Sequence, residues 1–136
     1  MSVSIGIEYL GNLQCRAIHE PSQQALLTDA PVDNGGRGAE FSPTDLVATA
    51  LGTCLLTVMG LVAARSNIDL RGTTVQVTKE MTADPVRRIG RLEVQIRYPA
   101  TLVVPEVERL KLERAAALCP VKQSLHPDVE IVVSYL

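Results

Sequence analysis

The segment that most constrains the fold of this chain runs from Leu46 to Ala64, LVATALGTCLLTVMGLVAA, and carries no charged residue. A single cysteine, Cys54, lies near its middle. Three structures accommodate such a segment: a membrane span, a plain buried helix, or a buried helix that presents a reactive thiol. Its length is close to the roughly 20 residues that cross a bilayer. The surrounding sequence has to decide between the three.

The residues on both sides of this segment have the alternation of apolar and polar side chains that is typical of half-buried strands. The predicted strands are 3–9, 13–20, 24–30, 74–78, 91–98 and 129–135. A second helix is predicted over 105–118, where Pro105 opens it. Hairpins grouped around helices predict an α+β fold with antiparallel sheets. This context favours a soluble domain over a membrane span.

The start of the apolar helix is well marked. Ser42 can cap it, Pro43 suits its first position, and Asp45 completes a capping box. We predict a helix that runs to about Arg65. A helix that is apolar on all faces has to be buried on all faces, and a chain of 136 residues can hardly enclose it alone. We therefore expect a partner subunit, as a homodimer, to cover its remaining face.

Composition excludes several classes of protein. The length predicts one domain, residues 1–136, and the net charge of −2 gives no case for a nucleic-acid or anionic-membrane partner. The N-terminus lacks the pattern of a secretory signal, so the expected compartment is the cytoplasm, where thiols stay reduced. Cys15 and His19 would lie roughly 13 Å apart along a strand, too far to share an ion, and we expect no metal and no cofactor.

Two of the three cysteines stand out by position. Cys54 has Gly52 beside it, which costs a helix about 1 kcal/mol against alanine and indicates a close neighbour. Cys119 precedes Pro120, and if Pro120 begins a short helix, the helix start favours a thiolate at Cys119. Two interpretations of Cys54 and Cys119 remain open: a nucleophile with its resolving partner, or two structural cysteines. Cys15 alternates with apolar neighbours and is expected to be a core residue of its strand.

Two longer pieces of the chain resemble the OsmC/Ohr family, the osmotically induced and organic hydroperoxide resistance proteins. They are SPTDLVATALGTC, residues 42–54, and LCPVKQSLHPDVEI, residues 118–131, at about the expected separation. The resemblance implies an α+β fold in which antiparallel sheets wrap around a buried central helix in an interwoven homodimer. It also implies a thiol-dependent peroxidase that reduces small organic hydroperoxides in oxidative stress defence, at the expense of a dithiol reductant.

Carried over to this sequence, the resemblance makes Cys54 the peroxidatic cysteine and Cys119 the resolving one. The best-characterised peroxidases of the family have a glutamate directly after the helix-start proline, where this chain has Thr44. Its acid comes one residue later, as Asp45, which is similar to a more divergent branch of the family. Asp45 is therefore either a catalytic residue or only a helix cap.

The family's peroxidases also use an early arginine to stabilise the thiolate, and here the matching position is close to Leu13. An apolar surrounding disfavours a thiolate, so a reactive Cys54 needs a cation near it. Arg16 and Arg37 are the two candidates, and Arg37 lies in the glycine-rich loop that leads into the helix.

Three functions remain open at this point. The leading hypothesis is the organic hydroperoxide peroxidase. The alternative is a dimer of the same fold that binds a small molecule in its apolar pocket with little or no turnover. The third is a structural dimer whose cysteines are inert. A catalytic thiolate has to form near neutral pH, which separates the first hypothesis from the other two.

Overall fold

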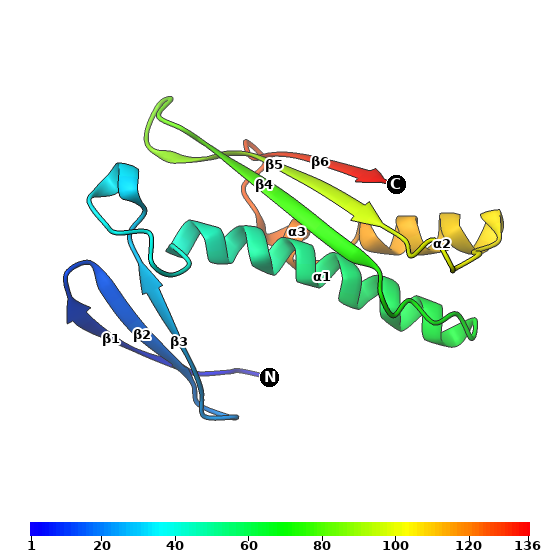
Figure 1. Cartoon of the computed structure of the whole chain (residues 1–136), viewed down its shortest axis with the longest axis horizontal. Helices are drawn as coiled ribbons and strands as arrows, with labels where there is room; N and C mark the ends of the chain where they lie inside the picture. The colour runs from blue at the N-terminus through cyan, green and yellow to red at the C-terminus, as the bar shows by residue number, and fades with distance from the viewer. The chain divides into compact units, whose positions relative to one another are not determined.

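The computed structural model describes residues 1–136, which form two compact units, 1–47 and 48–136. Figure 1 labels the elements along the chain. In order they are β1 (Ile5–Gly11), β2 (Gln14–His19), β3 (Gln24–Asp29), the 3₁₀ turn η1 (Val32–Asn34), α1 (Pro43–Arg65), β4 (Thr74–Thr82), β5 (Arg88–Arg97), α2 (Glu106–Ala116), α3 (Pro120–Ser124) and β6 (Glu130–Tyr135). The predicted α+β class is confirmed.

The N-terminal unit is built on a three-stranded antiparallel sheet in the order β1-β2-β3. Asn12 and Leu13, both with positive φ, make the turn between β1 and β2. One face of this sheet carries Ile7, Ala17 and Leu26 directly opposite one another on the three strands. Alternation from Ile5 to Tyr9 thus places the apolar side chains of β1 on this face, as the sequence predicts, whereas β2 and β3 carry apolar side chains on both faces.

Helix α1 begins with the predicted capping box. The Ser42 backbone N–H donates to Asp45 Oδ2 at 2.9 Å, and the Asp45 N–H donates to Ser42 Oγ at 3.1 Å. The helix ends at Arg65, and Asn67 follows in the left-handed region with a φ of 55°. Its start is fixed by reciprocal capping of orphan amides.

The C-terminal unit contains a second three-stranded sheet in the order β4-β5-β6. Strands β4 and β5 form the predicted antiparallel hairpin, but β6 pairs with β5 in parallel, with Leu92 opposite Ile131. The sheet is therefore mixed, whereas the sequence predicted antiparallel pairing throughout. The physical reason is the connection between β5 and β6, which contains α2 and α3 and is long enough for the crossover that parallel strands require.

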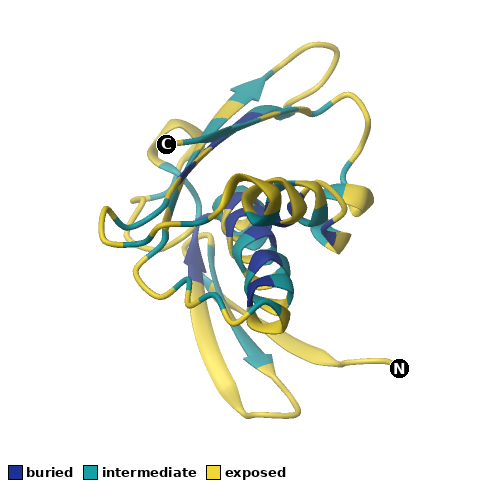
Figure 2. Cartoon of the chain, turned by 90° about the vertical axis from the view of Figure 1, so that its right-hand side faces the viewer, coloured by how far each residue is buried: buried dark blue, intermediate teal, exposed yellow.

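The core of the C-terminal unit lies between this sheet and α1. Figure 2 shows the buried residues concentrated on the helices and on the inner side of the sheet. Leu51, Leu55 and Met59 on α1 have no exposed surface and pack in one cluster with Leu92 and Val94. A Cβ added at Gly52 would lie 2.9 Å from a methyl carbon of Val77. The expected close neighbour of Gly52 is thus strand β4, which explains the glycine in the helix.

Helices α1 and α2 are joined at one end by a polar contact. The Ser66 hydroxyl, just after α1, donates to Glu108 Oε2 on α2 at 2.9 Å. This hydrogen bond, together with Lys111, lowers the pKa of the Glu108 carboxyl. Leu112 and Ala116 on the same helix are buried in the core. Helix α2 is therefore joined to α1 by this hydrogen bond, and Leu112 and Ala116 of its C-terminal half pack in the core.

Helix α1 is long and apolar enough to cross a membrane by length and composition. Ala48, Leu51, Leu55, Met59 and Ala63 are nevertheless buried inside the chain itself, on the side that faces the core. The helix serves as the core helix of the C-terminal unit, which is the role that the strand pattern around it predicted.

Candidate functional site

Cys54 lies in the middle of α1 and is half-buried. The two residues on either side of it along the core face, Leu51 and Leu55, are fully buried, and Cys54 packs against their cluster. Its sulfur therefore has an apolar surrounding and still keeps part of its surface open. A thiol in this position can meet a small apolar molecule.

Cys119 lies at the junction of α2 and α3 and is fully buried. Pro120 does begin a short helix, and Cys119 is its N-cap: the Lys122 backbone N–H donates to the Cys119 sulfur at 3.3 Å. The sequence-based expectation of this helix start is confirmed. The expectation that this helix start makes a thiolate easy to form at Cys119 is not confirmed, because a second effect on the Cys119 pKa is larger.

Burial is that larger effect, and it raises the pKa of the Cys119 thiol. The amide of Lys122 lowers the pKa, and Cys54 raises it further, both as a hydrogen-bond partner and as a charge. The two sulfurs are thus close enough to interact. A negative charge at Cys54 would therefore oppose ionisation of the Cys119 thiol.

The interaction with Cys54 predicts how the Cys119 thiol titrates when Cys54 is replaced. Replacing Cys54 by alanine removes the hydrogen bond and the charge that raise the pKa of Cys119, so the pKa of Cys119 should fall. The rate of Cys119 alkylation, followed by peptide mass spectrometry across a pH series, measures the change. Cys15→Ser is the control and should leave the Cys119 titration where it is. Identical Cys119 titrations in the wild type and in Cys54→Ala would show that the two sulfurs do not interact.

The other two predicted site residues, Arg37 and Asp45, belong to the N-terminal unit. Arg37 is exposed in the glycine-rich loop. Beside it, Gly36 packs so closely on Ala30 that a Cβ there would overlap the Ala30 carbonyl oxygen. The Arg37 backbone is therefore held at the end of β3, while its side chain reaches solvent. Asp45 is engaged in the capping box, which is its structural role in this chain.

The remaining candidates occupy the first sheet. Arg16 on β2 pairs with Glu8 on β1 at 3.6 Å, and both side chains are largely exposed. An exposed pair of this kind contributes little stability. Cys15 was expected in a strand core, but it is half-buried and lies outside the buried cluster. Its neighbours across the strands are Tyr9 and Thr28, on the apolar face of the sheet.

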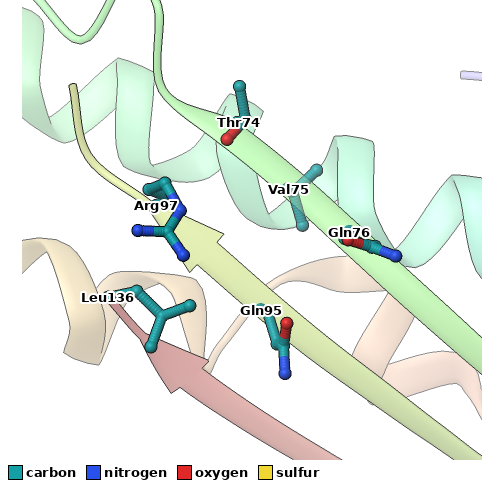
Figure 3. A pocket seen from close by; sticks show the side chains of 6 residues that line it. All are labelled: Thr74, Val75, Gln76, Gln95, Arg97 and Leu136. Carbon is teal, nitrogen blue, oxygen red and sulfur yellow. The ribbon is translucent and has the colours of Figure 1, made fainter.

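A pocket of about 310 Å³ opens on the side of the second sheet that faces away from the core (Figure 3). Its polar lining comes from alternate residues of β4 and β5, including Gln76, Gln95 and Arg97. No sulfur lines it. The thiol pair and this pocket are separate features, on opposite faces of the same sheet.

One buried acid was missed in the sequence. Asp29, the last residue of β3, is 1% exposed, and its carboxylate accepts a hydrogen bond from the backbone N–H of Ala39 at 3.1 Å. The only hint in the sequence is an acid that ends an apolar strand just before a glycine-rich loop. Such an acid is usually a turn residue, so the pattern alone does not distinguish it.

Comparison with protein families matches residues 35–134 to the model described as OsmC, OsmC-like protein. No curated protein sequence matches the chain. Among solved structures, a candidate osmotic stress induced and detoxification response protein from Psychrobacter arcticus is 40% identical. The match covers 100% of this chain and 96% of the other, with a TM-score of 0.92.

More distant structures share the fold. An organic hydroperoxide resistance protein OsmC from Legionella pneumophila is 17% identical over 99% of this chain and 96% of the other, with a TM-score of 0.77. An OsmC-like protein of unknown function from Vibrio cholerae is 13% identical over 100% of this chain and 99% of the other, with a TM-score of 0.83.

Proposed function

Since the chain belongs to the OsmC-like protein family, we propose that it is a thiol-dependent peroxidase that reduces organic hydroperoxides in oxidative stress defence. The observation that carries this proposal is the interacting pair Cys54 and Cys119, one half-buried and one fully buried in the core of the C-terminal unit. Structures of the same fold include proteins named for organic hydroperoxide resistance, at low identity.

In the proposed reaction, the Cys54 thiolate attacks one oxygen of the hydroperoxide, and the O–O bond breaks. The alcohol leaves with a proton, and Cys54 becomes a sulfenic acid. The Cys119 thiol then condenses with this sulfenic acid, which forms a disulfide and releases water. A dithiol reduces the disulfide by exchange and is itself oxidised. The raised pKa of Cys119 suits the resolving role, because only one thiol of the pair has to be ionised for the first step.

We also propose roles in this reaction for Arg37 and Asp45 of the N-terminal unit. A guanidinium near the thiolate offsets the apolar surrounding of Cys54, and an acid near the guanidinium orients it. Asp45 has the cap role in addition, so its substitution would also weaken the start of α1.

The test of this function is a peroxidase assay with cumene hydroperoxide and with hydrogen peroxide, each in the presence of a dithiol or a monothiol reductant. We expect turnover with cumene hydroperoxide and dithiol, and slower turnover with hydrogen peroxide, since the surroundings of Cys54 are apolar. No turnover with either peroxide, together with a co-purified ligand in native mass spectrometry, would favour the alternative of a small-molecule-binding dimer.

We also propose that the functional unit is a homodimer in the cytoplasm, in which residues 1–136 act as one domain. The apolar face of the first sheet supports this, because Ile5, Ile7 and Tyr9 are 58%, 70% and 62% exposed in the single chain. Contiguous exposed apolar side chains of this kind mark an interaction surface.

The exposed stripe of α1 supports the same dimer. Thr49, Thr53, Thr57 and Leu61 follow one another at every fourth residue on it. The hydroxyls of Thr53 and Thr57 donate to the carbonyls of Thr49 and Thr53, each at 2.8 Å. A partner could therefore cover this stripe without leaving those hydroxyls unpaired.

The dimer predicts a sedimentation result. At micromolar concentration the wild type should show no monomer. Leu61→Asp should shift the protein to monomer or unfold it, because it would bury a charge in the interface. Val86→Asp is the matched control: Val86 lies in the β4–β5 loop and is 62% exposed, compared with 61% for Leu61. A stable, folded wild-type monomer would contradict the proposal.

The choice of arginine predicts a difference in thiol reactivity. Arg37→Ala should slow the alkylation of Cys54 at neutral pH more than Arg16→Ala does, because Arg16 is paired with Glu8 across the first sheet. Alkylation with iodoacetamide, followed at the Cys54 peptide, gives both rates. Equal rates in the wild type and in both variants would remove arginine from the mechanism.

A further inference from the structure

The carboxylate of Asp29 is buried, yet it has only one hydrogen bond. Its Oδ2 accepts the backbone N–H of Ala39, and its Oδ1 is buried with no hydrogen-bond partner. Burying a charged oxygen without a partner costs free energy. An asparagine could accept the same bond from Ala39 without a charge. The contacts around Asp29 indicate what its carboxylate holds in place.

Besides its strand pairing with Gln14, Asp29 makes its contacts with the glycine-rich loop. The Asp29 backbone N–H donates to the Phe41 carbonyl at 3.2 Å, and the next residue, Ala30, accepts from the Gly38 N–H at 3.2 Å. Gly36 packs directly on Ala30, with no room for a side chain. The end of β3 thus contacts the loop on both sides of Arg37.

Backbone hydrogen bonds hold this loop at several points, and the conformational freedom of two glycines opposes them. Gly35 and Gly38 have φ of 88° and 62°, so both adopt the left-handed region that glycine enters freely. A loop with two such residues gains much conformational entropy when it opens. The hydrogen bond from the Ala39 N–H to the buried Asp29 carboxylate adds a charge-assisted contact to these backbone bonds.

We propose that Asp29 is a positioning residue for Arg37: its carboxylate anchors the glycine-rich loop at the end of β3 and so fixes where the guanidinium starts. This inference rests on the proposed function, in which Arg37 stabilises the Cys54 thiolate. Asp29 contacts neither peroxide nor sulfur in this role, and acts only through the loop.

The first arm of the test measures the opening of the glycine-rich loop by proteolysis. Limited trypsinolysis cleaves after Arg37, and the exposed Arg87 in the β4–β5 loop serves as an internal reference for global unfolding. In Asp29→Ala, cleavage after Arg37 relative to Arg87 should rise by about tenfold or more, since loss of a charge-assisted bond shifts local opening by that order. Asp29→Asn keeps an acceptor for Ala39 but loses the charge, so its ratio should lie between those of the wild type and Asp29→Ala. An unchanged ratio in Asp29→Ala overturns the proposal.

The second arm separates positioning from mere stability. Asp29→Ala should slow Cys54 alkylation by about the same factor as Arg37→Ala, and the double variant should be no slower than Arg37→Ala alone. Additive effects would mean that Asp29 acts by another route and would overturn the proposal. Alkylation of Cys54 at the wild-type rate in Arg37→Ala would also overturn the proposal. If that variant still turned over cumene hydroperoxide, the proposed peroxidase function would survive without it.

Discussion

Replacing Cys54 by serine should reduce peroxidase turnover to the level of buffer without protein. A serine hydroxyl does not ionise near neutral pH and cannot become a sulfenic acid, so no step of the proposed cycle can start. The side chains differ by one atom, and Cys54 is only half-buried, so the fold should persist. A coupled assay with cumene hydroperoxide and a dithiol measures the loss, and full activity in Cys54→Ser would exclude this cysteine as the nucleophile.

In Cys119→Ser, the catalytic cycle should stop after the first step rather than before it. Cys54 can still attack, so the variant should consume about one equivalent of peroxide per chain and then stall as sulfenic or sulfinic acid. Cys15→Ser is the matched control, since Cys15 lies on the first sheet, outside the buried cluster. It should turn over like the wild type.

The disulfide itself gives an independent check of the same prediction. After one equivalent of cumene hydroperoxide, peptide mapping should find Cys54 joined to Cys119 within one chain. The two Cα atoms would then lie within the usual disulfide reach of about 5.5–6 Å. If both thiols remain free while peroxide is consumed, the two-cysteine mechanism is wrong for this protein.

Much of the fold follows from local signals in the sequence. Ser42, Pro43 and Asp45 predict the start of α1 because each satisfies or tolerates an orphan amide of the first turn. The hairpin β4–β5 follows from strict alternation over both strands. Gly52 predicts a close neighbour, because tight packing against the helix can offset the low helix propensity of glycine. Val77 is that neighbour.

Long-range features could not be read in the same way. Alternation predicts that β6 is a strand, but it does not give the strand's partner or direction, and the parallel pairing with β5 was missed. The order strand, helix, strand in the last third of the chain is the pattern of a parallel crossover, so this signal was present. Asp29 carried no comparable signal, because its role depends on a backbone amide ten residues away.

The candidate site shows the same division between local and long-range information. The N-cap position of Cys119 follows from Pro120 alone. The net rise in the pKa of Cys119 does not, because it depends on how deeply the α2–α3 junction is buried and on the neighbouring Cys54 sulfur. A helix start favours a thiolate only where burial does not outweigh it. The surroundings of Cys119, on which its proposed resolving role depends, could therefore be read only from the structure.

Replacing Leu55 by alanine should cost the protein about 2–5 kcal/mol of unfolding free energy, the largest stability effect we expect from one core substitution. Leu55 follows Cys54 on α1, has no exposed surface and belongs to the cluster that joins α1 to strands β4–β6. Its removal leaves a cavity that a close-packed core fills only in part. Urea unfolding at a fixed protein concentration measures the loss, since unfolding of a dimer depends on concentration.

Leu118→Ala is the matched control for this prediction, because it removes the same atoms from a side chain that is 71% exposed. Its effect on the unfolding free energy should stay within about 0.5 kcal/mol. Leu55→Ala should also leave Cys54 able to form a sulfenic acid in those chains that remain folded, since Leu55 supports the helix without touching the peroxide chemistry. A loss in Leu55→Ala no larger than that in Leu118→Ala would mean that α1 is not the core helix of this chain.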